Sequence, residues 1–305
     1  MRRLTLVAAL AAAGALLLGA CGDDDSDDTD AADTTATPSD TTASETTASS
    51  GGDAAACAEG KTLEAGTLTI ATGNPAFPPY VIDDAPETGE GFEAAVALAV
   101  AREMGFEGDA VSWVRTGFDE AIQPGQKNFD FNLQQFSITD ERKQTVSFSD
   151  PYYSANQAIV GLSDSSAAGA TTMEDLKSLK FGAQTGTTSL QFITDVIQPD
   201  QEPFAYDDNV GAKAALEANQ IDAIVVDLPT AFYITAVEIE GTTVIGQFPA
   251  SAGGTTDDFG LLFDLDNPLV ECANIALATL KESGELATIE QTWMSDYTDA
   301  PLISV

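Results

Sequence analysis

The chain has 305 residues, of which 44% are hydrophobic, and its 49 acidic and 12 basic side chains give a net charge of −37. A chain this acidic makes nucleic acid and anionic lipid surfaces poor partners, and as the cause of the acidity we prefer solubility or adaptation to a salty habitat to an acidic binding role. Histidine is absent. Since histidine is the commonest general base and metal ligand, we expect neither a metal site nor a cofactor.

Residues 1–20 have the pattern of a signal peptide. Arg2 and Arg3 precede an apolar stretch from Leu4 to Ala20, which lacks the length and flanks of a stable membrane span. The stretch ends in LGAC at Leu18–Cys21, which resembles the lipobox of bacterial lipoproteins and implies a diacylglycerol on Cys21. The alternative is a plain secretory signal with an incidental cysteine. We predict an exported protein, anchored through Cys21 to the outer face of the cytoplasmic membrane.

Residues 21–56 are predicted to form a disordered tether after that anchor. The segment consists almost entirely of Asp, Thr, Ala, Ser and Gly and has no aromatic or basic side chain. Such a composition buries too little apolar surface to offset its ordering entropy. About 35 residues of coil span roughly 30–35 Å, which would lift the folded part clear of the membrane.

Two further cysteines, Cys57 and Cys272, lie near the two ends of the folded part. An exported location permits disulfides, and neither cysteine has the CxxC spacing of a zinc or redox site. We expect the two to be bonded to each other. The alternative is a pair of unpaired buried thiols.

The folded part alternates between predicted strands and helices. Alternating or continuous apolar runs predict strands at 67–71, 111–114, 129–133, 157–162, 180–184, 223–226 and 259–263. Helical periodicity and capping patterns predict helices or helical turns at 91–103, 118–122, 139–145, 172–176, after 188, 212–218, 269–281 and 285–294. This order favours an α/β protein with parallel sheets flanked by helices. Ligands of such sheets bind at the carboxyl ends of strands, where Ser137, Thr187, Thr188 and Asp227 are predicted to lie.

Several motifs in register resemble the family 3 extracellular solute-binding proteins, the receptors of polar amino acid ABC importers. The strongest are FSITDER at Phe136–Arg142 and VSFSDPYY at Val146–Tyr153. Further matches occur at residues 77–80, 91–93, 174–176, 182–188, 221–223 and 284–287 and at Trp293. The resemblance covers residues 66–295.

This resemblance implies a type II periplasmic-binding-protein-like α/β fold with two lobes and two hinge strands. The first lobe would comprise residues 66–153 plus 254–305, and the second residues 158–249. The hinges would lie near Ser154–Gln157 and Gly246–Ala250, and their bending would close the lobes on the ligand.

The resemblance also implies roles in binding a free amino acid. Arg142 occupies the family's carboxylate-binding position, where a planar guanidinium can make two parallel hydrogen bonds. Thr187 and Thr188 follow a glycine at a strand-to-helix turn, where free backbone N–H groups favour an anion. Asp227 matches the residue that binds the ammonium, and Ser137 the residue that assists it.

The ligand's side chain would meet Phe77 and Phe118, which match aromatic positions of the family. Gln134 and Gln135 depart from the small residues usual there, and one of them, for which we take Gln135, would narrow the pocket and offer an amide. In the lysine and arginine receptors of the family, an acidic residue binds the basic side chain of the ligand. The corresponding residue here is Gly73 or Asn74, and neither carries a charge. We therefore expect a neutral or acidic polar side chain.

The predicted function is an extracytoplasmic, monomeric substrate-binding lipoprotein that delivers a polar amino acid to an ABC permease. A phosphate-binding Gly-Lys-Ser/Thr loop is absent, so ATP hydrolysis would belong to separate ATPase subunits, and no enzymatic activity is expected. The alternatives are an amino-acid sensor that feeds a signalling receptor and a small-acid dehydratase on the same fold.

Overall fold

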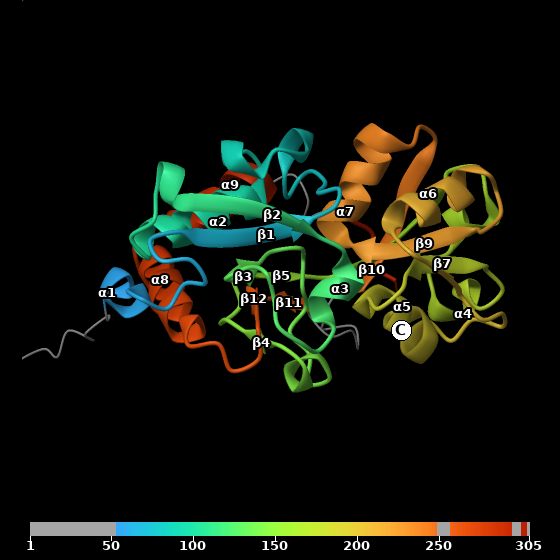
Figure 1. The fold of residues 1–305 in the computed structure, drawn as a ribbon. Helices are drawn as coiled ribbons and strands as arrows, with labels where there is room; N and C mark the ends of the chain where they lie inside the picture. Colours follow the sequence, from blue (N-terminus) through green and yellow to red (C-terminus); the bar gives the residue numbers. More distant parts are fainter. Residues whose placement is uncertain (1–52, 249–256, 295–299, 304–305) are drawn as a thin grey trace, which may run out of the picture. The chain divides into compact units, whose positions relative to one another are not determined.

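The computed structural model describes residues 53–248, 257–294 and 300–303, and the fold is drawn in Figure 1. The predicted signal peptide, Cys21 and most of the tether lie outside these residues. No helix of the described ranges is long and apolar enough to cross a membrane.

The first lobe is built on a five-stranded sheet in the order β2-β1-β3-β12-β4. Its strands are β1 (Leu68–Gly73), β2 (Val111–Thr116), β3 (Phe131–Asn132), β4 (Ser147–Phe148) and β12 (Leu262–Phe263). Strand β1 runs parallel to β2 and β3, whereas β12 pairs antiparallel with β3 and β4. The helices of this part of the chain are α1 (Ala54–Ala58), α2 (Phe92–Glu103), α3 (Phe118–Ile122), α8 (Leu269–Glu282) and α9 (Glu285–Met294).

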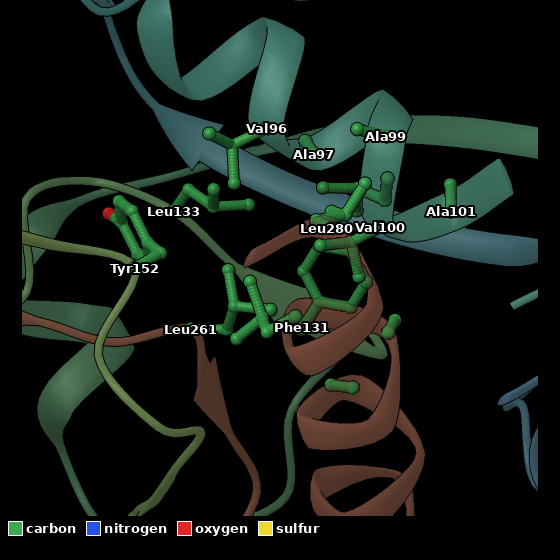
Figure 2. Close-up of a cluster of buried hydrophobic side chains, with 14 of the residues drawn as sticks. Val96, Ala97, Ala99, Val100, Ala101, Phe131, Leu133, Tyr152, Leu261 and Leu280 are labelled. Atoms are coloured by element: carbon green, nitrogen blue, oxygen red, sulfur yellow. The ribbon is translucent and has the colours of Figure 1, made fainter. Parts of the chain in front are cut away.

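The core of the first lobe lies where α2 and α8 pack against the sheet. Val96 and Val100 of α2 meet Phe131 of β3 and Leu280 of α8 there, and all four side chains are fully buried (Figure 2). The predicted helices at 91–103 and 269–281 are therefore present, and each buries its apolar face as amphipathic helices do.

The second lobe has its own five-stranded sheet in the order β10-β6-β9-β7-β8. Its strands are β6 (Gln157–Leu162), β7 (Phe181–Gln184), β8 (Phe204–Tyr206), β9 (Ala223–Asp227) and β10 (Thr242–Phe248). Its helices are α4 (Met173–Leu176), α5 (Thr188–Phe192), α6 (Asn209–Glu217) and α7 (Leu228–Tyr233), with π-helical turns at Ile193–Ile197 and Ile234–Glu238. Separate hydrophobic clusters, one containing Phe181 and the other Leu216, complete this lobe.

Both sheets are mixed, so the prediction of parallel sheets is wrong for part of each. Strand β6 pairs antiparallel with β9 and β10, while β7 is parallel to β8 and β9. The predicted strand at 259–263 is split into β11 (Asp257–Phe259) and β12, and β11 pairs antiparallel with β5 (Tyr153–Ala155). The chain passes from β5 to β6 through Asn156, within the first predicted hinge. Of the second predicted hinge, Gly246–Ala250, residues 246–248 end β10 and residues 249–250 lie outside the described residues.

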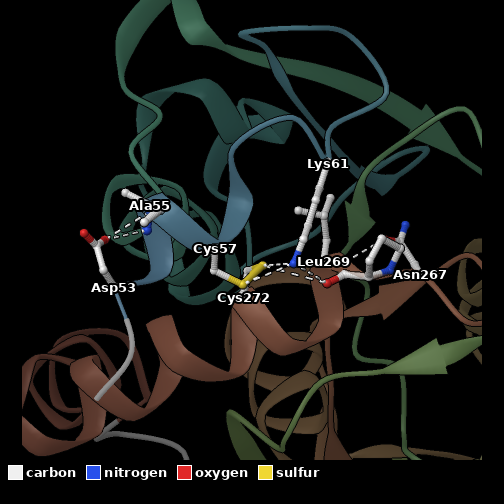
Figure 3. The surroundings of a disulfide bond; sticks show 9 residues. Asp53, Ala55, Cys57, Lys61, Asn267, Leu269 and Cys272 are labelled. Atoms are coloured by element: carbon white, nitrogen blue, oxygen red, sulfur yellow. Dashed lines mark hydrogen bonds between the residues drawn. A yellow bond between two sulfur atoms is a disulfide. The ribbon is translucent and has the colours of Figure 1, made fainter. Parts of the chain in front are cut away.

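The Cys57–Cys272 disulfide is present, as predicted, and ties α1 to α8 with a Cα–Cα distance of 5.4 Å (Figure 3). The Asp53 carboxylate caps α1 by accepting hydrogen bonds from the backbone N–H groups of Ala55 and Ala56 at 3.0 and 3.2 Å. The prediction of a disordered tether up to residue 56 is therefore wrong for its last residues. A helix cap and a covalent cross-link together offset the ordering entropy there.

Residues 300–303 pack against the second lobe, so their assignment to the first lobe is wrong. Gln247 of β10 donates from its backbone N–H to the Pro301 carbonyl at 2.7 Å, and Ile303 donates to the Gln247 carbonyl at 3.2 Å. Ile303 is 1% exposed among the side chains around Phe181. The segment thus pairs with strand β10, which lies at the edge of the sheet and would otherwise expose unpaired backbone groups.

Candidate functional site

A cavity of about 70 Å³ lies between the two lobes, and all eight residues predicted to bind ligand line it. The first lobe contributes Phe77, Phe118, Gln135, Ser137 and Arg142, and the second contributes Thr187, Thr188 and Asp227. A larger hollow of about 1110 Å³ lies beside α8 and contains none of them. Ligand pockets usually occupy about 300–1,000 Å³, so the lobes leave little free space around the predicted site.

Arg142 is 7% exposed and begins a 3₁₀ turn at Arg142–Gln144. Its Nη1 donates to the Ser137 carbonyl at 2.7 Å, and its Nη2 donates across the lobes to the Gly186 carbonyl at 3.0 Å. The Phe118 ring lies under the guanidinium at 5.3 Å and stacks on Phe136. Burial lowers the pKa of Arg142, and the carboxylates of Asp257 and Asp227 oppose the shift. Because a guanidinium has five N–H donors, donors remain for a ligand anion.

Thr187 and Thr188 lie where strand β7 turns into α5. Thr187 caps the helix by accepting from the Leu190 N–H at 3.1 Å and donates to the Gln184 carbonyl at 2.7 Å. The hydroxyl of Thr188 lies 3.2 Å from that of Ser137 in the other lobe. The backbone N–H groups at the start of this turn therefore lie beside the cavity, close to Arg142.

Asp227 is the last residue of β9 and is half-buried. Its Oδ1 accepts from Gln157 Nε2 at 2.9 Å. Burial, followed by the nearby Asp257 carboxylate, raises the pKa of Asp227 well above its ordinary value, while Gln157 and Arg142 oppose the shift. An acid in these surroundings favours a cation beside it.

The sequence did not predict a site role for three residues around Asp227, which are Gln157, Asp257 and Ser189. Gln157 Nε2 also donates to Asp257 Oδ2 at 2.7 Å, and Gln157 Oε1 accepts from the Ser189 hydroxyl at 2.7 Å. Gln157 opens β6 and Asp257 opens β11, and the two meet because β11 pairs with β5 just before the crossing. Gln157 lies opposite Asp227 in the antiparallel β6–β9 register, so two long-range pairings assemble this network, and no local motif marks either of them.

The other residues that line the cavity are uncharged, and several of them are polar. Gln134 and Gln135 both line the cavity, and the buried Oε1 of Gln134 has no hydrogen-bond partner among the described residues. A Cβ atom on Gly73 would lie 2.9 Å from the Pro75 carbonyl and 3.0 Å from Gln134 Nε2. The Gln134 amide therefore occupies the space that an acidic side chain at position 73 would need.

Phe77 carries the ammonium of Lys213 over its ring at 4.8 Å. Lys213 is itself paired with Glu238 at 2.6 Å, so its charge is matched within the protein. The charged side chains that line the cavity within the described ranges are Arg142 and Asp227. The same ranges contain no cluster of three or more groups suited to a metal ion.

Comparisons with known proteins match most of the folded part of the chain. The family model for bacterial extracellular solute-binding proteins, family 3, matches residues 68–296. An arginine-binding periplasmic protein of Mannheimia haemolytica is 30% identical over 224 residues, which are 72% of this chain and 88% of that protein.

Solved structures share the fold. An ancestral arginine-binding protein bound to glutamine superposes with a TM-score of 0.63 at 30% identity and covers 76% of this chain and 99% of its own. An ancestral amino acid-binding protein, a precursor of cyclohexadienyl dehydratase, gives a TM-score of 0.61 at 29% identity over 75% and 95%. The predicted fold class, the two-lobed α/β fold of type II periplasmic binding proteins, is confirmed.

Proposed function

The chain belongs to family 3 of the bacterial extracellular solute-binding proteins, and from this premise we propose that it captures a neutral polar amino acid and delivers it to an ABC permease. The ATPase that drives transport is a separate subunit of the importer. The protein acts as a monomer outside the cytoplasm and is held to the membrane by lipid on Cys21. It is a binding protein and not an enzyme.

The observation that carries this proposal is the charge balance of the cavity. Among the described residues that line it, Arg142 supplies the positive charge and Asp227 the negative one. These two charges match the carboxylate and ammonium of a free amino acid. No further charge of the lining is then left to pair with a charged side chain of the ligand. The raised pKa of Asp227 supports the assignment, because a ligand ammonium would stabilise its charged form.

A polar residue of the cavity lining supports a ligand side chain that can donate a hydrogen bond. Gln134 Oε1 is a buried acceptor without a partner, and leaving such a group unsatisfied is unfavourable. A terminal amide would satisfy it, which makes L-glutamine the first candidate. Some relatives of similar sequence are arginine-binding proteins. A neutral ligand in this chain is compatible with that, because Gly73 and Gln134 provide no acid for the guanidinium of arginine.

A thermal-shift screen against the twenty amino acids tests the proposal. A ligand at 100 times its dissociation constant stabilises a protein by about 2.7 kcal/mol, and we expect L-glutamine or another neutral polar amino acid to give the largest shift. Glutamine with an acetylated ammonium or an amidated α-carboxylate should give none. A larger shift with L-arginine would contradict the neutral side chain, and no shift with any amino acid would contradict amino acid capture.

A further inference from the structure

Glu93 is a buried acid directly behind the wall of the cavity. It lies in the first turn of α2 and is 1% exposed. Its Oε1 accepts from the Tyr152 hydroxyl at 2.5 Å and from the Gln135 backbone N–H at 2.8 Å, and its Oε2 accepts from Gln135 Nε2. All three partners are neutral donors. None of the ion pairs within the described residues includes Glu93.

Gln135 donates two hydrogen bonds to this carboxylate. Its φ is +51°, a left-handed backbone that is unfavourable for a residue with a side chain. The backbone N–H and the side-chain amide both bond Glu93, and both bonds offset that strain. Gln135 also lines the cavity, so Glu93 holds in place a residue that faces the ligand.

The titratable groups around Glu93 come from three other segments. Tyr152 lies just before β5. Tyr80 lies in a loop, and its backbone carbonyl accepts a hydrogen bond from the Glu93 backbone N–H at 3.0 Å. Asp227 ends β9 in the second lobe. None of the three is a cation. Burial raises the pKa of Glu93 to about 7, and the hydrogen bonds from Tyr152 and Gln135 oppose the shift.

We propose that Glu93 decides which polar atom Gln135 presents to the cavity, and that proton uptake by Glu93 reverses this choice. When Glu93 is charged, it holds Gln135 Nε2, and Oε1 is the atom left to accept a hydrogen bond from a ligand. A proton on Oε2, which has Gln135 Nε2 as its partner, makes that oxygen a donor. Two donors cannot bond each other, so the Gln135 amide turns to accept with Oε1 and presents Nε2–H to the cavity.

The consequence is a pH-dependent preference between related ligands. Above the titration midpoint, an acceptor in the cavity favours the side-chain amide N–H₂ of L-glutamine. Below it, a donor favours the carboxylate of L-glutamate. This consequence rests on the proposed function, because it takes Gln135 to be a ligand contact.

The coupling itself is tested without ligand, by following the Gln135 backbone and side-chain N–H resonances of the purified protein by NMR from about pH 5 to pH 9. We expect a single titration with a midpoint near 7 that is lost in Glu93→Gln and retained in the exposed control Glu90→Gln. Tyr152→Phe should move the midpoint to higher pH, because the lost hydroxyl stabilises the charged form. A flat Gln135 profile in the unmodified protein, or an unmoved midpoint in Tyr152→Phe, would overturn the proposal, even if Glu93→Gln fails to fold.

The preference is tested by calorimetric titration with L-glutamine and L-glutamate at pH 6 and pH 8. We expect the ratio of the two affinities to change by about tenfold between these values, the effect of one hydrogen bond, and to be independent of pH in Glu93→Gln. A constant ratio in the unmodified protein would refute the preference. If neither amino acid binds, the proposed ligand class is wrong, while the NMR titration still decides whether Glu93 controls Gln135.

Discussion

The hydroxyl oxygens of Ser137 and Thr188 lie 3.2 Å apart, and this contact joins the first lobe to the second at the edge of the cavity. Arg142 makes a second such contact with the Gly186 carbonyl, and Thr230 makes a third with the hydroxyl of Tyr80 at 3.3 Å. Ser137 and Thr188, both predicted to bind the ligand, thus bond each other across the lobes. These contacts and those of a ligand together contribute to the free energy of closure.

Gly186→Ala tests this closure. Gly186 has φ +70°, and a Cβ there would collide with the Asp119 carboxylate of the first lobe. We expect the variant to disfavour the closed arrangement, with a larger radius of gyration in solution scattering at saturating L-glutamine and a weaker affinity. Gly241→Ala is the matched control, because Gly241 has φ +79° and its Cβ would meet nothing within 4 Å. An unchanged scattering curve and affinity in Gly186→Ala would contradict a two-lobe clamp.

Arg142→Ala should abolish most of the affinity for the amino acid while leaving the fold intact. Removing one side of a desolvated charge pair costs about 2–5 kcal/mol, or roughly 30-fold to several-thousand-fold in affinity. Calorimetric titration of the unmodified protein and the variant with L-glutamine measures the loss. Arg142→Lys, which keeps the charge without the planar fork, should recover part of it. A change below about threefold would remove Arg142 from the site.

Asp227→Asn should weaken ligand binding and stabilise the ligand-free protein. The folded pKa of Asp227 is raised above its ordinary value of 3.8, so protonation favours the folded state below that value and this stability is lost as the pH rises. The melting temperature of Asp227→Asn should therefore exceed that of the unmodified protein by an amount that grows above about pH 3.8. A lower melting temperature at every pH would show that the charged carboxylate stabilises the fold.

Removing the Cys57–Cys272 bridge should destabilise the first lobe. The bond joins residues 215 apart in sequence, and the loop-entropy estimate gives an upper figure of about 4–5 kcal/mol. The double variant Cys57→Ala/Cys272→Ala should unfold at a lower urea concentration than the oxidised protein. Non-reducing peptide mapping of protein from an oxidising compartment should recover the two cysteine peptides joined, and free thiols at both positions would refute the bridge.

Ile303→Ala should destabilise the second lobe, although the residue is third from the end of the chain. Truncating a buried isoleucine typically costs about 2–5 kcal/mol, and Ile303 is 1% exposed. Its neighbour Leu302 is 62% exposed, so Leu302→Ala should change stability by no more than about 0.5 kcal/mol. Equal urea midpoints for the two variants would show that residues 300–303 do not support the second lobe.

Local patterns in the sequence determined the positions of the elements that matter most for the site. The helix at 91–103, the strand that ends at Asp227 and the turn at Thr187 were predictable, because hydrophobic period and capping chemistry act within a few residues. The register of the family motifs then predicted which side chains would meet, and all eight line one cavity. Their ligand roles stay predictions until binding is measured.

Tertiary structure alone decided the contacts that join distant segments. Gln157 meets Asp257, Glu93 meets Gln135, and Ile303 packs near Phe181 because strand pairing and lobe packing bring together residues that no local pattern relates. The antiparallel pairing of β6 with β9 and β10 is likewise long-range, and the apolar runs of these strands do not mark it. A carboxylate's neighbours in space determine its pKa, so the raised pKa values of Glu93 and Asp227 could not be read from the sequence.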